Sequence, residues 1–344
     1  MSISEFFRNL FKRKTAELPS PRPEERYILC IDGGGMRGII PVVFLQVLEK
    51  SLRENGGEQD IAKYFDLIAG TSTGGLISLA LSCSSSLPHQ EHGGSDQIDL
   101  AALLENYMTM GSEIFQAISF YTFRQIVSNK YNSGSLQNLA QRWFGAETMQ
   151  NAKVPTLIMS YDLTAGQPQM IRSYADESSY PVWVAARSTS AAPTYFSPCE
   201  YEGKLLVDGG VAANNPAIYA YFEAKRLFPR CSKFHILSIS TGGTYHTMTK
   251  DETRGLMNWA EQVSPLYSTA QKRTADFVME NIPDADYVRF DDALSIHVKM
   301  DEVNPAILQR IKTEAKNNVL KHGQTIENFT KQLIANMEFR NNAS

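Results

Sequence analysis

The sequence has few cysteines and no long apolar run. Its four cysteines lie far apart and none belongs to a C-x-x-C pair, so neither a zinc knuckle nor a redox motif is indicated; they are Cys30, Cys83, Cys199 and Cys231. No stretch approaches the roughly 18 consecutive apolar residues of a membrane-spanning helix, and the N-terminus lacks the apolar core of a signal peptide. We therefore expect a cytoplasmic protein with reduced thiols that neither spans a membrane nor is secreted.

A strong charge of one sign is also missing. The 33 Lys and Arg residues against 37 Asp and Glu residues leave a net charge of −4 over 344 residues. This balance creates no broad field that would attract a nucleic-acid polymer, so no such partner is expected. The length and the apolar fraction of 43% are typical of a globular protein, long enough for one large α/β domain with appendages.

No metal or cofactor is expected either. His89 and His92 lie in a stretch rich in Ser, Gly and His, from Ser82 to Gln97, but no further histidine or carboxylate follows at a recognised ligand spacing. The chain also lacks the D-x-[DN]-x-[DN]-G pattern of a calcium-binding loop. We interpret this stretch as a surface excursion.

The first 14 residues have the pattern of an amphipathic helix. Their apolar residues follow the i, i+3, i+4, i+7, i+8 spacing of one helix face, and four basic residues against one acidic residue give a local charge of +3; the apolar residues are Ile3, Phe6, Phe7, Leu10 and Phe11. Two interpretations stay open. The segment docks onto the body of the protein or onto a second copy in a homo-oligomer, or it lies on an anionic membrane and makes the protein peripheral on the inner membrane surface.

Alternating apolar patterns predict an α/β fold. A buried strand at Tyr27–Ile31 is followed by a helix over Ile39–Leu52, and a second strand at Leu67–Ala69 is followed by a helix over Leu76–Leu81. Strand, helix, strand, helix favours a mostly parallel central sheet that is covered on both faces. Further strands are predicted at 154–159, 204–207 and 234–239, further helices at 100–115 and 135–144, and mainly helices near the C-terminus.

A G-x-S-x-G element stands between the second strand and its helix. It consists of Gly70, Thr71, Ser72, Thr73 and Gly74. In this context Ser72 is expected on a tight, exposed turn, because side chains at the flanking glycines would crowd the bend, and the helix that follows presents its N-terminus to developing negative charge. A phosphate-binding or merely tight turn is the structural alternative.

A second glycine turn follows the first strand. Its six residues are Gly33, Gly34, Gly35, Met36, Arg37 and Gly38. Freed backbone N–H groups here could bind a pyrophosphate, as in dinucleotide-binding proteins, or the oxyanion of a tetrahedral intermediate. The acidic residue that would hold a ribose is not at the end of the second strand, since Glu54 and Glu58 lie in a glycine-rich turn before it. Two glycine turns at successive strand ends favour one shared acyl-transfer site.

A candidate base follows a third strand, in the run Asp208-Gly209-Gly210. Asp208 could take the Ser72 proton directly, provided that burial raises its basicity above that of an exposed carboxylate. The alternatives are a turn-forming aspartate and a Ser-Asp-His triad with His235 or His246, which follow in the chain order of α/β-hydrolases. The spacing does not decide between dyad and triad.

Together these motifs resemble the patatin-like phospholipase family of the bacterial type. The residues that carry the resemblance are Asp32 to Pro41, Gly70 to Gly75, Asp208-Gly209-Gly210, Ser190 to Phe196 and Asn214-Asn215-Pro216. The resemblance implies a three-layer α/β/α fold, Ser72 as nucleophile, Asp208 as general base without histidine, and the turn from Gly33 to Gly38 as oxyanion hole. Arg37 would hold that turn or meet a lipid phosphate.

The resemblance also implies a function. It indicates a metal-independent lipid acyl hydrolase of the phospholipase A or lysophospholipase type, with a phospholipid substrate at a membrane surface and free fatty acid as product. The chain would then comprise an N-terminal segment and linker (1–25), a catalytic domain (26–245) and a mainly helical C-terminal region (246–344). A regulated effector with a small-molecule activator and a non-enzymatic anion- or nucleotide-binding module remain as alternatives.

Overall fold

The structure is a computed structural model that describes residues 24–58, 60–83, 98–115, 130–242 and 256–343. Its strands are β1 (Glu25–Ile31), β2 (Leu67–Thr71), β3 (Thr156–Asp162), β4 (Gln167–Arg172), β5 (Cys199–Tyr201), β6 (Lys204–Asp208), β7 (Lys233–Ile239) and β8 (Ala285–Phe290). Its α-helices are α2 (Ile39–Glu54), α3 (Thr73–Ser82), α4 (Leu100–Ile114), α5 (Ser133–Phe144), α6 (Val182–Thr189), α7 (Ala217–Leu227), α8 (Leu256–Glu280), α9 (Pro305–Lys321) and α10 (Gly323–Ala343).

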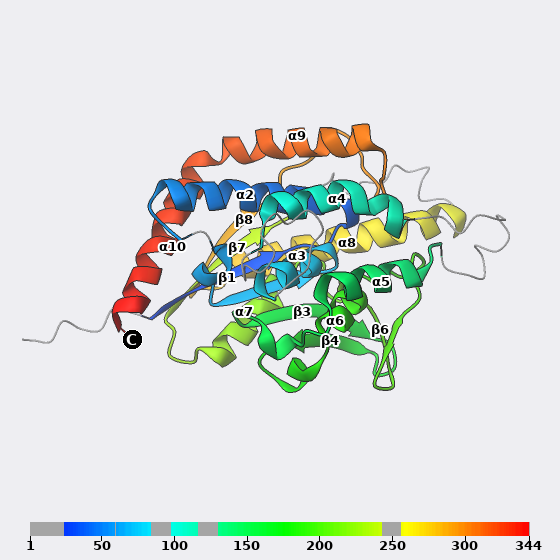
Figure 1. The fold of residues 1–344 in the computed structure, drawn as a ribbon, viewed down its shortest axis with the longest axis horizontal. Coiled ribbons are helices and arrows are strands. Elements are labelled where there is room, and N and C mark those ends of the chain that lie inside the picture. The colour runs from blue at the N-terminus through cyan, green and yellow to red at the C-terminus, as the bar shows by residue number, and fades with distance from the viewer. Residues whose placement is uncertain (1–23, 59, 84–97, 116–129, 243–255, 344) are drawn as a thin grey trace, which may run out of the picture.

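The strands form one mixed, mostly parallel sheet in the order β5-β6-β3-β2-β1-β7-β8, and β4 also pairs with β3. Strands β3, β2, β1, β7 and β8 run parallel to one another, whereas β4 and β6 run antiparallel to β3. Parallel strands need crossover connections: α2 lies between β1 and β2, helices α3 to α5 lie between β2 and β3, and α8 lies between β7 and β8 (Figure 1). The predicted α/β fold with a mostly parallel sheet is confirmed.

The two faces of the sheet pack against different helices. Along β1, Tyr27, Leu29 and Ile31 belong to one apolar cluster and Ile28 and Cys30 to another, as the two-residue period of a strand requires. The first cluster includes side chains of α2, α3, α4 and α9, and the second those of α7 and the end of α8. Figure 1 shows α2, α4 and α9 above the strands and α7 below them, and the two clusters on opposite faces of the sheet give three layers.

Strand register brings two of the predicted site residues to one level of the sheet. Thr71, the last residue of β2, lies opposite Met159 of β3, and Asp208, the last residue of β6, lies opposite the next residue of β3, Ser160. Ser72 follows Thr71 directly. Strand β4 occupies the other edge of β3 along Leu157–Asp162, so β2 and β6 share one edge and the serine turn and the candidate base emerge where the ends of these two strands meet.

The C-terminal part is mainly helical, as predicted, with α8, α9 and α10. The sequence prediction missed β8, which joins the sheet beside β7 and so ties this part to the same core.

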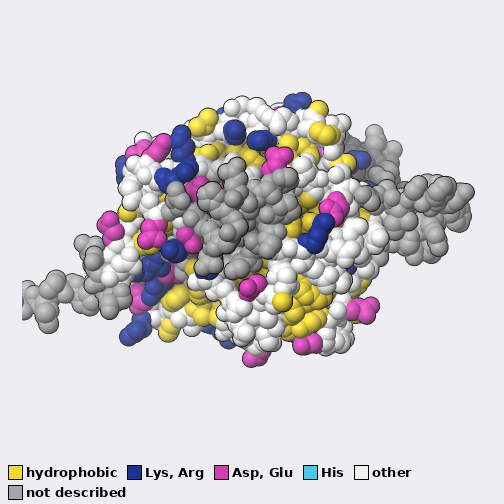
Figure 2. Space-filling view, in the orientation of Figure 1, with side chains coloured by type: hydrophobic (Ala, Val, Ile, Leu, Met, Phe, Trp, Pro, Cys, Tyr) yellow, Lys and Arg dark blue, Asp and Glu magenta, His cyan; other side chains and the backbone are white. Residues whose placement is uncertain are grey.

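The predicted N-terminal helix (1–14) and most of the stretch at 82–97, with His89 and His92, lie outside the described residues. In the part that is described, no helix is both long enough and apolar enough to cross a bilayer. Figure 2 shows basic and acidic side chains interspersed over the face seen in Figure 1.

Candidate active site

Ser72 occupies a strained turn between β2 and α3. Its backbone has φ 54° and ψ −124°, a conformation that non-glycine residues rarely adopt and that places a nucleophilic serine at the tip of a strand-turn-helix elbow. The flanking glycines are required by close approach of the backbone. A Cβ atom on Gly70 would lie 2.3 Å from the carbonyl oxygen of Gly74, and one on Gly74 would lie 2.2 Å from that of Ile31.

Hydrogen bonds from three neighbouring elements fix this elbow. The Ser72 N–H donates to Oγ1 of Thr189 at the end of α6 (2.8 Å), and that hydroxyl donates to the Met159 carbonyl of β3 (2.6 Å). The Thr71 hydroxyl donates to the Ala213 carbonyl (2.8 Å), and the Thr73 hydroxyl bonds the Tyr107 hydroxyl (2.6 Å). Sequence reasoning missed Thr189, because nothing near it in the chain points to the elbow.

The Asp208 carboxylate faces the Ser72 hydroxyl at the end of β6. The Ser72 side chain and the Gly210 N–H, which lies 2.7 Å from Oδ1, both hydrogen-bond the carboxylate. Asp208 is only 6% exposed, and burial raises its pKa to about 6 although both hydrogen bonds act in the opposite direction. The sequence argument required such burial for Asp208 to act as a base near neutral pH.

The glycine turn after β1 lies against the same serine. A Cβ atom on Gly33 would come within 3.1 Å of the Ser72 Cβ atom. Several amides of the turn are already bonded: Gly33 donates to the Asn214 carbonyl (3.1 Å), Met36 to the Met300 carbonyl (2.8 Å) and Arg37 to the Gly34 carbonyl (3.3 Å).

Two amides of this turn are left for a ligand. Within the described chain, the N–H groups of Gly34 and Gly35 have no hydrogen-bond acceptor. Gly35 has φ 60°, a conformation suited to glycine, and lines the same pocket as Ser72. Adjacent free backbone donors beside a serine are what an oxyanion hole requires.

An apolar pocket opens over Ser72 and Asp208. It encloses about 570 Å³ of space that is continuous with solvent, and both Ser72 and Asp208 lie in its wall. The other walls are mostly apolar side chains, three of which belong to α4. These wall residues are Met36, Leu76, Tyr107, Met110, Ile114, Phe115, Leu136 and Phe196. A pocket with this lining suits a hydrocarbon chain that ends at a polar reacting group.

Comparison with known proteins decides the family. The family model described as "Patatin-like phospholipase" matches residues 29–221, more than half of the chain. The chain belongs to this family. Patatin-like protein 2 of Arabidopsis thaliana is 32% identical over 317 residues, which cover 77% of this chain and 75% of that protein. Patatin-like protein 1 of Oryza sativa subsp. indica is 30% identical over 80% of this chain and 76% of its own.

This patatin-like chain is also similar to Patatin-T5 of Solanum tuberosum, with 27% identity over 92% of this chain and 91% of that protein. Family membership assigns the general class of lipid acyl hydrolase. The resemblance seen in the sequence is thereby confirmed for the family, and every residue from the two glycine turns to Asp208 falls inside the matched span.

One of the two histidines considered for a triad is remote from this patatin-like site. His235 lies near the start of β7, opposite Tyr27 of β1, whereas Ser72 follows the carboxyl end of β2. Its ring nitrogens bond Asp286 (2.9 Å) and Glu25 (3.1 Å), and its ring stacks on Tyr27. His235 is therefore a structural residue of the sheet. His246 lies outside the described residues.

Arg37 faces inward in this structure. Its guanidinium group bonds the Gly34 carbonyl (Nε, 3.4 Å) and the Val298 carbonyl (Nη1, 3.5 Å), and burial lowers its pKa. Of the two roles left open by the sequence, these contacts support that of holding the turn. Gly38 allows the same close packing, because a Cβ atom there would lie 2.4 Å from the Thr73 hydroxyl.

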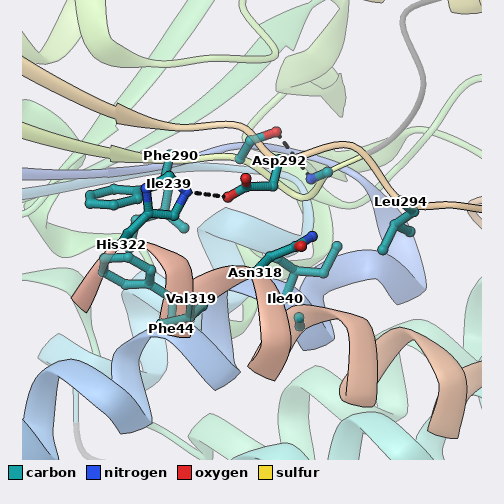
Figure 3. Close-up of a pocket in the computed structure, with 12 residues that line it drawn as sticks. Ile40, Phe44, Ile239, Phe290, Asp292, Leu294, Asn318, Val319 and His322 are labelled. Carbon is teal, nitrogen blue, oxygen red and sulfur yellow. Dashed lines mark hydrogen bonds and ion pairs between the residues drawn. The ribbon is translucent and has the colours of Figure 1, made fainter.

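A second pocket, shown in Figure 3, lies behind the glycine turn between α2, α9 and the ends of β7 and β8. His322, the residue that follows α9, bonds Asp292 across it (2.8 Å), while Ile40, Phe44 and Phe290 form part of its apolar wall. The one serine that lines this pocket is Ser240, whose hydroxyl oxygen accepts a hydrogen bond from the Gly242 N–H. Among the described residues that line the pocket, no carboxylate is hydrogen-bonded to Ser240 and could act as its base. The pocket over Ser72 is therefore the candidate reaction site.

Proposed function

We propose that this protein hydrolyses acyl esters of membrane phospholipids with a Ser72–Asp208 dyad, without histidine and without metal. The observation that carries the proposal is the contact of the Ser72 hydroxyl with a buried carboxylate whose pKa is raised to about 6, at the wall of an apolar pocket. Family membership supplies the class of reaction. The product is a free fatty acid.

The first half of the reaction forms an acyl-enzyme. Asp208 accepts the proton of the Ser72 hydroxyl while the serine oxygen forms a bond to the ester carbonyl carbon. The N–H groups of Gly34 and Gly35 stabilise the oxyanion of the tetrahedral intermediate. The intermediate collapses with cleavage of the ester C–O bond, and the leaving alcohol, a lysolipid, takes the proton from Asp208.

The second half releases the fatty acid. Asp208 accepts a proton from a water molecule while the oxygen of that water attacks the acyl carbon. Collapse of the second tetrahedral intermediate breaks the bond to Ser72, whose oxygen regains the proton. The apolar pocket holds the acyl chain through both halves, so chain length should affect KM and the orientation of the carbonyl carbon.

A membrane-surface location follows from this substrate and is part of the proposal. The N-terminal segment gives a direct test, since its deletion (residues 1–14) should reduce binding to anionic vesicles and leave hydrolysis of a short soluble ester unchanged. Unchanged vesicle binding would remove the segment from the membrane account.

Labelling and turnover together test the dyad. The purified protein should hydrolyse a p-nitrophenyl butyrate ester and react with a fluorophosphonate probe on the peptide that contains Ser72. Asp208→Asn should slow both by at least about 100-fold, because the general base is lost. Labelling of another serine, or an Asp208→Asn variant with wild-type rates, would overturn the assignment. A protein that binds anions at both glycine turns but neither turns over ester nor reacts with the probe would favour the binding-module alternative.

A further inference from the structure

Asp32, which immediately precedes the glycine turn, is a completely buried carboxylate. It is 0% exposed, and its backbone N–H donates to the Ile239 carbonyl at the end of β7 (3.0 Å). A buried carboxylate is stable only when it is paired and hydrogen-bonded. The residue that pairs with the Asp32 carboxylate therefore helps to fix the position of the first residue of the glycine turn.

Arg289 of β8 is that residue. Its two terminal nitrogens each donate to a different oxygen of Asp32, at 2.8 and 2.7 Å, and Nη1 also donates to the Ser238 hydroxyl of β7 (2.8 Å). The two parallel hydrogen bonds fix the orientation of the carboxylate as well as its position. Arg289 thus reaches across β7 from the outer strand of the sheet to the end of β1.

The same arginine connects the turn to the loop that carries the base. Its Nε lies 3.4 Å from Oδ1 of Asp276 on α8, and that carboxylate accepts hydrogen bonds from the Tyr287 hydroxyl (2.8 Å) and from Nδ2 of Asn215 (3.2 Å). Asn215 belongs to the segment that follows Asp208. Lys272 (3.7 Å from Asp32) and Asp291 (3.6 Å from Arg289) complete a largely buried cluster of three carboxylates and two cations.

We propose that Arg289 is a positioning residue, which acts through Asp32 to hold the Gly34 and Gly35 amides where the oxyanion forms. The inference rests on the proposed function. Arg289 lies outside the span that the family model matches, which ends at residue 221, so no family motif assigns it this role. Oxyanion donors contribute to the rate only when they are held in place before the charge develops. A turn that shifts by a fraction of an ångström should therefore lose kcat with little change in KM, because the acyl pocket binds the substrate independently.

The test compares variants of the pair with a matched control. Arg289→Met, Arg289→Lys and Asp32→Asn are measured for kcat and KM on the soluble ester, beside Arg172→Met. Arg172 forms a similar two-bond pair with Glu177 (3.1 and 3.2 Å), but it stands at the end of β4, on the edge of β3 opposite to that which pairs with β6 and Asp208. Thermal melting reports the folding of each variant.

We expect Arg289→Met and Asp32→Asn to lose about 100-fold in kcat with KM within about threefold, and Arg289→Lys to recover part of that loss. The double variant D32N/R289M should lose little more than either single variant, because both act through one pair. Arg172→Met should keep kcat within about threefold. Asp32→Asn and Arg289→Lys provide the measurement if Arg289→Met does not fold.

Three results would overturn the inference: wild-type kcat in Arg289→Lys and Asp32→Asn, an equal loss in Arg172→Met, or a loss confined to KM. Failure of the proposed function is distinguishable, since the wild-type protein itself would then show no ester hydrolysis and no labelling of Ser72.

Discussion

Gly33 and Asn214 are joined by two hydrogen bonds that run in opposite directions. The Gly33 N–H donates to the Asn214 carbonyl (3.1 Å), and Nδ2 of Asn214 donates to the Gly33 carbonyl (3.2 Å). Asn214 follows the dyad aspartate by six residues, so this double link ties the candidate oxyanion turn to the loop of the candidate base. Neither part of the site can shift without the other.

The double link predicts a coupled loss of activity. The Gly33 carbonyl also accepts the Thr241 hydroxyl (2.7 Å), so Asn214→Ala or Thr241→Val alone leaves it one donor. Each single variant should reduce kcat/KM by about tenfold, and the double variant by clearly more than the roughly 100-fold product of the two, because the buried carbonyl then has no side-chain donor. Steady-state kinetics on a soluble ester measures this. Strictly multiplicative effects with no excess in the double variant would contradict the coupling.

Activity should depend on the protonation of Asp208. Since the pKa of Asp208 is raised to about 6 and the carboxylate form is the base, kcat/KM should rise with pH through about 6 and level off above about 7. Below pH 5, kcat/KM should fall about tenfold for each unit by which the pH decreases. A pH profile of the soluble-ester reaction measures the midpoint. A midpoint near 4, the value of an exposed aspartate, would show that burial does not set the basicity.

The same burial should cost stability. The pKa of Asp208 is 3.8 when exposed and about 6 in the folded protein, so the folded state binds this proton more tightly and loses stability as pH rises from about 4 to about 6. The loss above pH 6 is at most about 3 kcal/mol. Asp208→Asn, which cannot ionise, should therefore melt at a higher temperature than the wild type at pH 8 and not at pH 4. Ser72→Ala is the control, since it retains the buried carboxylate and should gain nothing at pH 8.

Gly34 should tolerate no side chain. A Cβ atom there would lie 2.1 Å from the Thr241 hydroxyl and 2.5 Å from its Cβ atom, so Gly34→Ala must displace either the turn or Thr241. The loss of an oxyanion donor typically lowers kcat by about 100- to 1,000-fold, and we expect a loss in that range. Gly323→Ala, at the start of α10 with open space around it, should leave kcat unchanged. Full activity in Gly34→Ala would remove this amide from the mechanism.

The centre of the candidate site could be proposed from the sequence because it is built from local turns. The residues between a strand and a helix around Ser72, and the glycines after β1, show their geometry in their own spacing. The residues that hold these turns in place from distant parts of the chain were not predictable in the same way. Arg289 and Asp32 are 257 residues apart, and no pattern near either residue indicates the other.

The missed elements have physical reasons. Strand β8 has the sequence ADYVRF, in which charged residues interrupt the apolar alternation because Arg289 faces the buried Asp32. Strand β4 contains a proline and two exposed residues at the side of the sheet.

The most direct test of the account is the release of fatty acids from mixed phospholipid vesicles, measured by mass spectrometry for the wild type and for Ser72→Ala with EDTA in both reactions. We predict release by the wild type, undiminished by EDTA because the dyad alone activates the serine, and a rate at least about 1,000-fold lower in Ser72→Ala. Equal release by both proteins, or release by the wild type that EDTA abolishes, would contradict a serine-based, metal-independent lipid acyl hydrolase.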